Sequence, residues 1–339
     1  MSSGLKRTYV TVDHERVGTS FTPYRAPRWL PGGHLQTIYA YYLPRPSLQF
    51  RRERWETPDG DFIDLDWLDS TANAAALVVL FHGLEGCSQS HYALSFANEL
   101  RRQNCRGVIV HSRGCSGEIN QLARSYHAGD SAEVDWILRQ LKMKNPKSRL
   151  YVVGISMGGN DLLKWLGEQA ERALETIQRA VAISAPLDLK IAAKHLDSGW
   201  NKLLYTRDFL RTMKRKVLEK ISTHGLELDA RLIRCSSTFR EFDDLYTAPV
   251  HGFKDANDYW MLSSSRPWLR HIRVPTLIIN ARNDPFFPGD ALPGRSEVSE
   301  AVSLEYPESG GHVGFVSGDF PGHLQWLPRR MLHFFGTRN

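Results

Sequence analysis

The chain has 339 residues, of which 42% are hydrophobic, and it carries a formal net charge of +6 at pH 7. A chain of this length can bury a large core, and it fits one α/β domain with an insertion better than two independent domains. No run of about five or more basic residues occurs, and Lys214-Arg-Lys216 is typical of a solvated helix face. Composition thus argues against a nucleic-acid partner and favours only weak attraction to an anionic membrane surface.

The cysteines and the apolar runs predict where in the cell the protein is located. The segment Met1–Thr8 is polar and lacks the apolar core of a signal peptide. The longest apolar run has eight residues, far fewer than the roughly 20 that a membrane-spanning helix needs. No C-x-x-C or zinc-type spacing links the four cysteines, and we expect a cytoplasmic protein in a reducing compartment. The cysteines are Cys87, Cys105, Cys115 and Cys235.

The N-terminal part predicts an arm followed by a hairpin. Residues 1–47 begin with a polar stretch and continue into the aromatic and proline-rich Phe21–Gly33, which lacks regular periodicity. We expect this arm to cover the sheet or to rim the site. Residues 49–56 and 62–68 read as an antiparallel hairpin because they are β-favouring segments joined by Pro58-Asp-Gly-Asp61.

After the hairpin, strand and helix patterns alternate, as in a parallel doubly wound sheet. The predicted strands cover residues 76–81, 107–111, 149–154, 179–184, 274–280 and 301–306. The predicted helices cover residues 91–103, 131–143 and 160–174.

Residues 187–265 interrupt this alternation with consecutive helical patterns, and we expect them to form a cap that shapes a pocket. The core would then comprise residues 48–186 and 266–339. Eight aromatic residues stand in the expected cap, and core packing explains most of them. They are Trp200, Tyr205, Phe209, Phe239, Phe242, Tyr246, Tyr259 and Trp260.

The most informative motif is Gly154-Ile-Ser156-Met-Gly158, which follows a strand pattern and precedes a helix pattern. A serine at such a turn is the nucleophile elbow of a serine hydrolase. It requires a strained backbone at the serine, and glycines where any Cβ would collide with neighbouring segments. We therefore predict that Ser156 is the nucleophile.

A nucleophile elbow needs an acid and then a histidine further along the chain. Asp284 lies in a turn-rich loop after the strand at 274–280, and His312 lies in a glycine-rich loop after the strand at 301–306. Both stand just beyond the carboxyl ends of predicted strands, where open α/β sheets place their sites. Asp284 could instead cap a turn, with Asp290 as the nearby acid, and His127 is a histidine that could reach the site.

A second glycine motif predicts an oxyanion hole. The apolar run that ends at Phe81 leads into His82-Gly-Leu-Glu-Gly86. Serine hydrolases hold the oxyanion with the N–H after the nucleophile and an N–H from the loop after an earlier strand. Those groups are the backbone N–H of Met157 and of Leu84. His82 is expected to support the loop, although a simple strand-ending turn is the alternative.

Together these motifs resemble the α/β-hydrolase superfamily, and in particular the AB hydrolase 4 family, which is related to bacterial hydrolases of the YheT type. The resemblance spans roughly residues 25–336 and implies an α/β-hydrolase fold with an N-terminal antiparallel hairpin and a helical cap insertion. It also implies Ser156 as nucleophile, His312 as base and Asp284 as its partner. The other matching motifs are Gly32-Gly-His-Leu-Gln-Thr37, Pro58-Asp-Gly-Asp-Phe62, His111-Ser-Arg-Gly-Cys-Ser-Gly117 and Asn283-Asp-Pro-Phe286.

The sequence thus predicts a serine esterase that acts on small-molecule acyl esters of short to medium chain length and needs neither a metal nor an organic cofactor. An acyltransferase or thioesterase that uses the same triad is the first alternative. A non-catalytic binding module on a hydrolase scaffold is the second.

Overall fold

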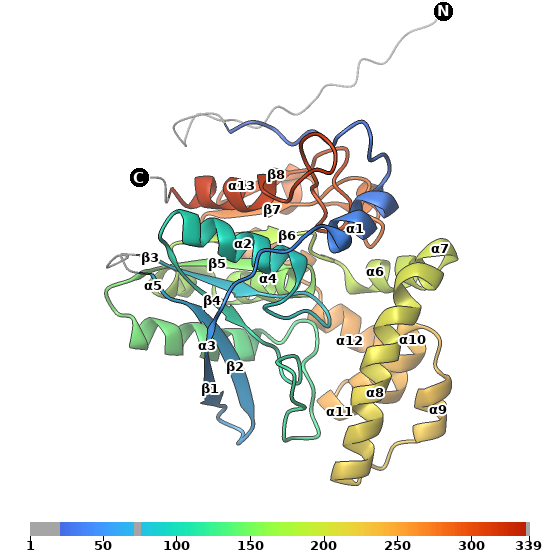
Figure 1. Cartoon of the computed structure of the whole chain (residues 1–339). Coiled ribbons are helices and arrows are strands. Elements are labelled where there is room, and N and C mark those ends of the chain that lie inside the picture. The colour runs from blue at the N-terminus through green and yellow to red at the C-terminus, as the bar shows by residue number, and fades with distance from the viewer. Residues whose placement is uncertain (1–20, 71–75, 337–339) are drawn as a thin grey trace, which may run out of the picture.

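The computed structural model describes residues 21–70 and 76–336 of the chain. An eight-stranded sheet crosses its centre, with the strand order β1-β2-β4-β3-β5-β6-β7-β8 (Figure 1). The strands are β1 (Arg51–Glu56), β2 (Phe62–Leu68), β3 (Ala76–Phe81), β4 (Arg106–Val110), β5 (Arg149–Ile155), β6 (Arg179–Ile183), β7 (Thr276–Ile279) and β8 (Val302–Glu305).

The sheet confirms the predicted mixture of strand directions. The hairpin strands β1 and β2 pair antiparallel, and β2 also runs antiparallel to β4. From β4 to β8 every neighbouring pair is parallel. Because the carboxyl ends of parallel strands meet at one edge of a sheet, the loops after β3, β5, β7 and β8 share that edge.

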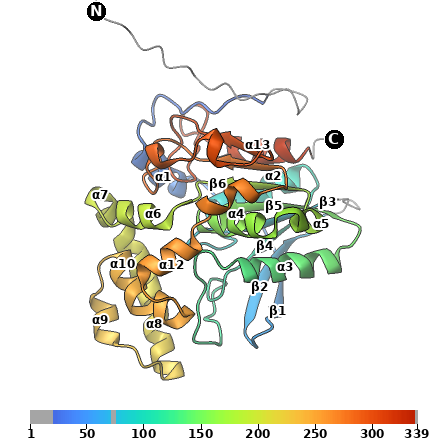
Figure 2. The same cartoon turned by 180° about the vertical axis from the view of Figure 1, so that it is seen from behind.

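Helices cover both faces of the sheet, as Figures 1 and 2 show from opposite sides. The alternation of side chains along β3 shows the division, since Leu77 and Val79 belong to one apolar cluster while Val78 and Leu80 belong to the other. The first face carries α3 (Ser131–Lys144) and α4 (Met157–Gln169), with the short helices η1 (Ala170–Arg172), α5 (Ala173–Thr176) and η4 (Arg266–His271) nearby. The second carries α2 (His91–Arg102) and α13 (Trp326–Phe335).

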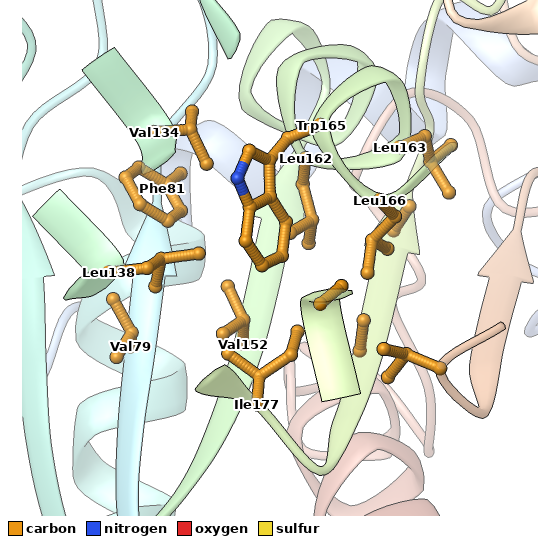
Figure 3. Packing of buried hydrophobic residues seen from close by; sticks show 14 of the residues in the cluster. Val79, Phe81, Val134, Leu138, Val152, Leu162, Leu163, Trp165, Leu166 and Ile177 are labelled. Carbon is orange, nitrogen blue, oxygen red and sulfur yellow. The ribbon is translucent and has the colours of Figure 1, made fainter. Parts of the chain in front are cut away.

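Helix α4 is the most deeply buried of these helices, and it holds the serine turn against the sheet. Figure 3 shows Leu162, Trp165 and Leu166 of α4 packed against Val152 of β5 and against Ile177. Each of these side chains is fully buried, and burial of such a side chain contributes about 1.5–3 kcal/mol. The helix begins at Met157, three residues before the predicted start, so the turn at Ser156 passes directly into it.

Between β6 and β7 the chain forms consecutive helices, which lie together beside the sheet (Figure 1). They are α6 (Leu189–Leu196), α7 (Gly199–Asn201), η2 (Lys202–Thr206), α8 (Arg207–His224), α9 (Ala230–Cys235), α10 (Phe239–Phe242), η3 (Asp243–Thr247), α11 (Ala248–His251) and α12 (Ala256–Ser263). We call residues 189–263 the helical segment. Six of the eight aromatic residues expected in the cap are buried; Phe209 is partly buried and Trp200 is 71% exposed. Core packing thus accounts for most of them, as predicted.

The arm contains a helix that the sequence patterns did not predict. Its first 20 residues lie outside the described residues, but Gly33–Tyr42 forms α1. This helix lies close to the start of the helical segment, at the edge where the strands end (Figures 1 and 2). The loop after β7 contains the short helices η5 (Gly289–Ala291) and η6 (Arg295–Glu297). In the described part of the chain, no helix is long and apolar enough to cross a membrane.

Candidate active site

Ser156 occupies the turn between β5 and α4 in a backbone conformation that side-chain-bearing residues rarely adopt. Its φ is 53° and its ψ is −118°. Its N–H donates to the carbonyl of Ile183 on the neighbouring strand at 2.7 Å, which ties the turn to the sheet. A Cβ added to Gly158 would stand 2.6 Å from the carbonyl oxygen of His82, and one added to Gly154 would stand 2.4 Å from that of Gly158. The crowding that the motif predicts is therefore present.

The structure brings Ser156, His312 and Asp284 together. Nε2 of His312 lies 2.9 Å from Oγ of Ser156, and Nδ1 lies 2.9 Å from Oδ2 of Asp284. Because the ionised carboxylate can only accept, the proton of the neutral imidazole belongs on Nδ1, and Nε2 is left to accept from the serine hydroxyl. The Asp284 side chain is buried and also accepts from the backbone N–H of Phe286 at 2.8 Å.

The alternative residues lie elsewhere. Asp290 is exposed in η5. His127 packs against His251, Phe253 and Tyr259 of the helical segment, and its Nδ1 donates to the carbonyl of Ala128. Neither contacts His312 or Ser156 among the contacts of the described residues.

Aromatic side chains cover the imidazole of His312. The ring of Phe286 stacks on it, with centroids 3.8 Å apart and planes 12° apart. Tyr205 of η2 packs against Phe286 in turn, with centroids 4.7 Å apart. Burial, together with the charge of Asp284, raises the pKa of Tyr205 to about 12, so its phenol stays neutral even in mildly alkaline solution. Phe286 from the loop after β7 and, behind it, Tyr205 from the helical segment therefore form an apolar, uncharged layer over the histidine.

The loop after β3 lies directly against the serine. A Cβ added to Gly83 would stand 2.9 Å from Cβ of Ser156, so only glycine allows this approach. The N–H groups on either side of Leu84 are occupied, since Gly83 donates to the hydroxyl of Tyr92 and Glu85 donates to that of Tyr126. Within the described residues, the N–H groups of Leu84 and Met157 donate no hydrogen bond. These are the two donors that the sequence motifs predict for the oxyanion.

His82 fixes the shape of this loop as a neutral group. Its Nδ1 donates to the carbonyl of Gly83 at 2.8 Å, and its Nε2 accepts from the N–H of Ser112 at 3.0 Å. Burial, with a smaller contribution from His111, lowers the pKa of His82 to about 3. Because Nε2 must accept, protonation would break the bond to Ser112.

Helix α1 supplies a clamp that sequence reasoning missed. The side chain of Gln36 is 1% exposed, and its Oε1 accepts from Nδ2 of Asn283 at 3.1 Å and from the N–H of Gly310 at 2.8 Å. One buried amide thus joins the loop that carries Asp284 to the loop that carries His312. Oδ1 of Asn283 then accepts from the N–H of Gly311 at 3.0 Å, which closes the connection.

Thr37 extends this clamp to the histidine itself. Its Oγ1 accepts from the backbone N–H of His312 at 2.8 Å and donates to the carbonyl of Gly33. The start of α1 packs so tightly that a Cβ added to Gly33 would stand 1.8 Å from the carbonyl oxygen of Asn283. The motif Gly32–Thr37 was the only sequence signal for this contact, and it did not indicate that α1 binds the loops that carry Asp284 and His312.

The chain also matches a known protein family. The sequence profile described as "alpha/beta hydrolase fold" matches residues 76–319, which contain all three residues of the candidate triad. The chain belongs to the α/β-hydrolase fold family. It is 37% identical to the Escherichia coli (strain K12) protein "Putative esterase YheT" over 316 residues, with 90% of each chain covered. It is also 25% identical to human "Phospholipase ABHD3", with 90% of this chain and 76% of that protein covered.

Solved structures show the same fold. The Pyrococcus furiosus esterase Pf2001 superposes with a TM-score of 0.54 at 17% identity, and the match covers 86% of this chain and 97% of that one. The resemblance of the sequence to α/β-hydrolases of the YheT type is thus confirmed, and the fold class is confirmed with it.

We expect Gln36→Ala to disturb the triad of this α/β-hydrolase more than it disturbs the fold. The substitution leaves the buried N–H of Gly310 and the amide of Asn283 without their acceptor, at a cost of about 1–3 kcal/mol for each unsatisfied group. Labelling of Ser156 by a fluorophosphonate should slow at least about tenfold under conditions where urea unfolding shows the variant to be folded. A matched control is Gln178→Ala, because Gln178 also accepts a backbone N–H, that of Leu150, but away from the triad. Equal labelling rates in the two variants would contradict the clamp.

A second prediction concerns His82 and the stability of the fold at acid pH. Folded His82 stays neutral down to about pH 3, whereas in the unfolded chain it binds a proton near pH 6.5. The unfolded state therefore binds more protons between these values, and the stability that His82 provides is lost as the pH falls below about 6.5. As the pH falls from about 6.5 toward 3, the unfolding free energy of wild type should approach that of His82→Gln. The difference between them should shrink by up to about 1.4 kcal/mol for each pH unit. Urea unfolding at several pH values tests this, and a constant difference would refute it.

Proposed function

We propose that this α/β-hydrolase is a serine esterase that cleaves carboxylic esters with short- to medium-chain acyl groups through an acyl-enzyme. The observation that carries the proposal is the unbroken set of hydrogen bonds from Asp284 through His312 to Ser156. Both bonds are 2.9 Å long, which is within the range expected between a nucleophile, its base and the group that orients the base.

In the proposed reaction, Oγ of Ser156 attacks the ester carbonyl while Nε2 of His312 takes the hydroxyl proton. Asp284 keeps the other proton on Nδ1 and stabilises the imidazolium that forms. His312 then protonates the departing alcohol, and the acyl group is left on Ser156. Water attacks this acyl-enzyme while His312 takes a proton from it, and His312 then gives that proton to Oγ of Ser156 as the bond to the acyl group breaks. The carboxylic acid leaves and the free serine is restored.

The negative charge of each tetrahedral intermediate would be held by the N–H groups of Leu84 and Met157. Each such donor contributes on the order of 3 kcal/mol to the transition state. Support comes from the position of Met157 at the first turn of α4, where the helix dipole also favours negative charge. Further support comes from Gly83, whose closeness to Ser156 brings the Leu84 loop to the reacting carbon.

The helical segment would act as the cap of the proposed site and bind the acyl chain. One apolar cluster contains Met157 and Phe286 from the core together with Tyr205, Phe242 and Trp260 from this segment, and Leu84 packs against it. An apolar chain attached to the reacting carbonyl would find hydrocarbon and aromatic contacts there. In this proposal helix α1 of the arm (residues 1–47) holds the catalytic loops, and residues 48–186 and 266–339 form the hydrolase core.

The named activities of the relatives favour an ester substrate of lipid type. The Escherichia coli relative is named as an esterase and the human relative as a phospholipase. We extend these names to this chain only as far as ester hydrolysis in lipid metabolism. A cytoplasmic location and weak association with a membrane surface are parts of the same proposal.

Labelling with a fluorophosphonate tests the nucleophile. The reagent should attach to wild type at Ser156 and fail to attach to Ser156→Ala, because Ser156 has a histidine base at 2.9 Å whose other ring nitrogen is held by a buried carboxylate. Peptide mapping identifies the labelled residue. Ser156→Ala should also lose activity toward p-nitrophenyl esters with acyl chains from acetate to octanoate. Acyl-CoA substrates assayed in parallel test for thioesterase activity. Labelling at another serine, or full activity of Ser156→Ala, would refute the proposal.

A separate experiment tests the acid. Asp284→Asn should leave the fold intact and lower kcat by about 10⁴, because an amide in this place favours the wrong imidazole tautomer. Asp290→Asn is the matched control, since Asp290 is an exposed acid of the same loop and should keep wild-type turnover. If Asp284→Asn kept more than about a tenth of wild-type kcat, Asp284 would serve only as a turn cap.

A further inference from the structure

Two neighbouring helical stretches expose large apolar side chains next to the candidate site. On α1, Leu35 is 54% exposed and Tyr42 is 75% exposed. On α7 and η2, Trp200 is 71%, Leu203 is 54% and Leu204 is 40% exposed. Single exposed apolar residues are ordinary on protein surfaces, but a contiguous group marks a contact surface. We call these five residues the apolar rim.

Helical spacing places the members of each stretch on one side of their helix. Leu35 and Tyr42 are seven residues apart, which is about two turns of α1. Trp200, Leu203 and Leu204 stand at i, i+3 and i+4 in a continuous helical run. Each stretch therefore presents an apolar stripe rather than scattered side chains.

The two stretches contact one another. Nδ1 of His34 on α1 lies 3.0 Å from the hydroxyl of Tyr205 on η2, and the two rings lie parallel within 10°. Leu35 and Leu204 are the chain neighbours of this pair, so the two stripes adjoin there. Figures 1 and 2 both show α1 and α7 at the same end of the molecule.

The rim also borders the proposed catalytic residues. Tyr205, which follows Leu204, packs on Phe286, and Phe286 stacks on His312. On the other side, Thr37 of α1 accepts the backbone N–H of His312. A surface bound at the rim would thus lie beside the histidine that serves Ser156.

The charge around the rim selects an anionic partner. Residues 21–47 and 189–207, which contain the rim, carry seven lysines and arginines and a single acid, Asp197. The formal net charge of the whole chain is +6, so these two segments account for all of the excess. Lys194 and Arg207, on either side of the exposed α7 and η2 residues, are themselves exposed. A second copy of this chain would bring like charges together, whereas an anionic lipid surface attracts them.

We propose that the apolar rim docks on the surface of an anionic phospholipid bilayer, with aromatic and leucine side chains entering the interface and the flanking cations meeting lipid phosphates. Tryptophan and tyrosine are the aromatic residues that favour this interface. The inference deepens the proposed function, because it places the site of a lipid esterase against the phase that contains its substrate.

Vesicle sedimentation tests the docking. The full chain should bind vesicles of phosphatidylcholine with phosphatidylglycerol, and it should bind pure phosphatidylcholine at least about tenfold more weakly. Raising the salt concentration should weaken binding to the vesicles that contain phosphatidylglycerol. The double variant Trp200→Ser with Leu203→Ser should lose at least about tenfold in affinity and keep wild-type turnover of a soluble p-nitrophenyl ester.

The matched control is Met261→Ser with Leu262→Ser, because these α12 side chains are 66% and 52% exposed but lie outside the rim. This control should bind vesicles like wild type. Equal binding by the rim variant and wild type would overturn the proposal, as would an absence of binding at low salt. So would a dimer, seen by sedimentation equilibrium, that the rim variant abolishes. Ser156→Ala should bind vesicles normally, so failure of the esterase proposal and failure of docking give different results.

Discussion

The strained turn at Ser156 is the constraint on which the rest of the site depends. A residue with φ of 53° costs on the order of 1–3 kcal/mol and persists only when its surroundings enforce it. Here backbone hydrogen bonds hold the strained conformation. The N–H of Ser156 donates to a carbonyl of β6, and its own carbonyl accepts from the N–H groups of Gly159 and Asn160. The atoms that crowd Gly154 and Gly158 are also backbone atoms. No side-chain rearrangement can relax the turn, and the serine oxygen is therefore fixed relative to the sheet.

The other groups of the proposed triad must be brought to that fixed oxygen from loops that are flexible by composition. Gly310 and Gly311 precede His312, and both have positive φ, which glycine adopts without penalty but which leaves the loop poorly specified by itself. The buried amide of Gln36 fixes this loop by accepting the N–H of Gly310, although the two residues are 274 positions apart in the chain. Because the same oxygen also bonds Asn283, any shift of one loop is transmitted to the other.

Local patterns were enough to predict most of the fold. Each predicted strand of the sheet agrees with the structure to within about two residues at either end, because alternating or β-branched runs bounded by turns are local signals. Ser156, Asp284 and His312 could be singled out because strand ends and glycine motifs mark them in the sequence. Helix α1 could not be, since Gln36 and Thr37 owe their importance to partners in distant loops. The exposure of Trp200 was equally hidden, because an aromatic residue in a helical segment is ordinarily part of the core.

The apolar layer over His312 connects the chemistry to the choice of substrate. Attraction between an imidazolium and the buried carboxylate of Asp284 is stronger where water is excluded, and Phe286 and Tyr205 provide that exclusion on one side. The phenol of Tyr205 is neutral, and its raised pKa extends that neutrality to alkaline pH, so it adds no competing charge. The remaining side, toward Ser156 and Leu84, must open to admit an ester. A substrate whose acyl chain is itself apolar restores the water-free shell as it binds, whereas a polar acyl group does not. The same physical requirement therefore favours lipid-like esters.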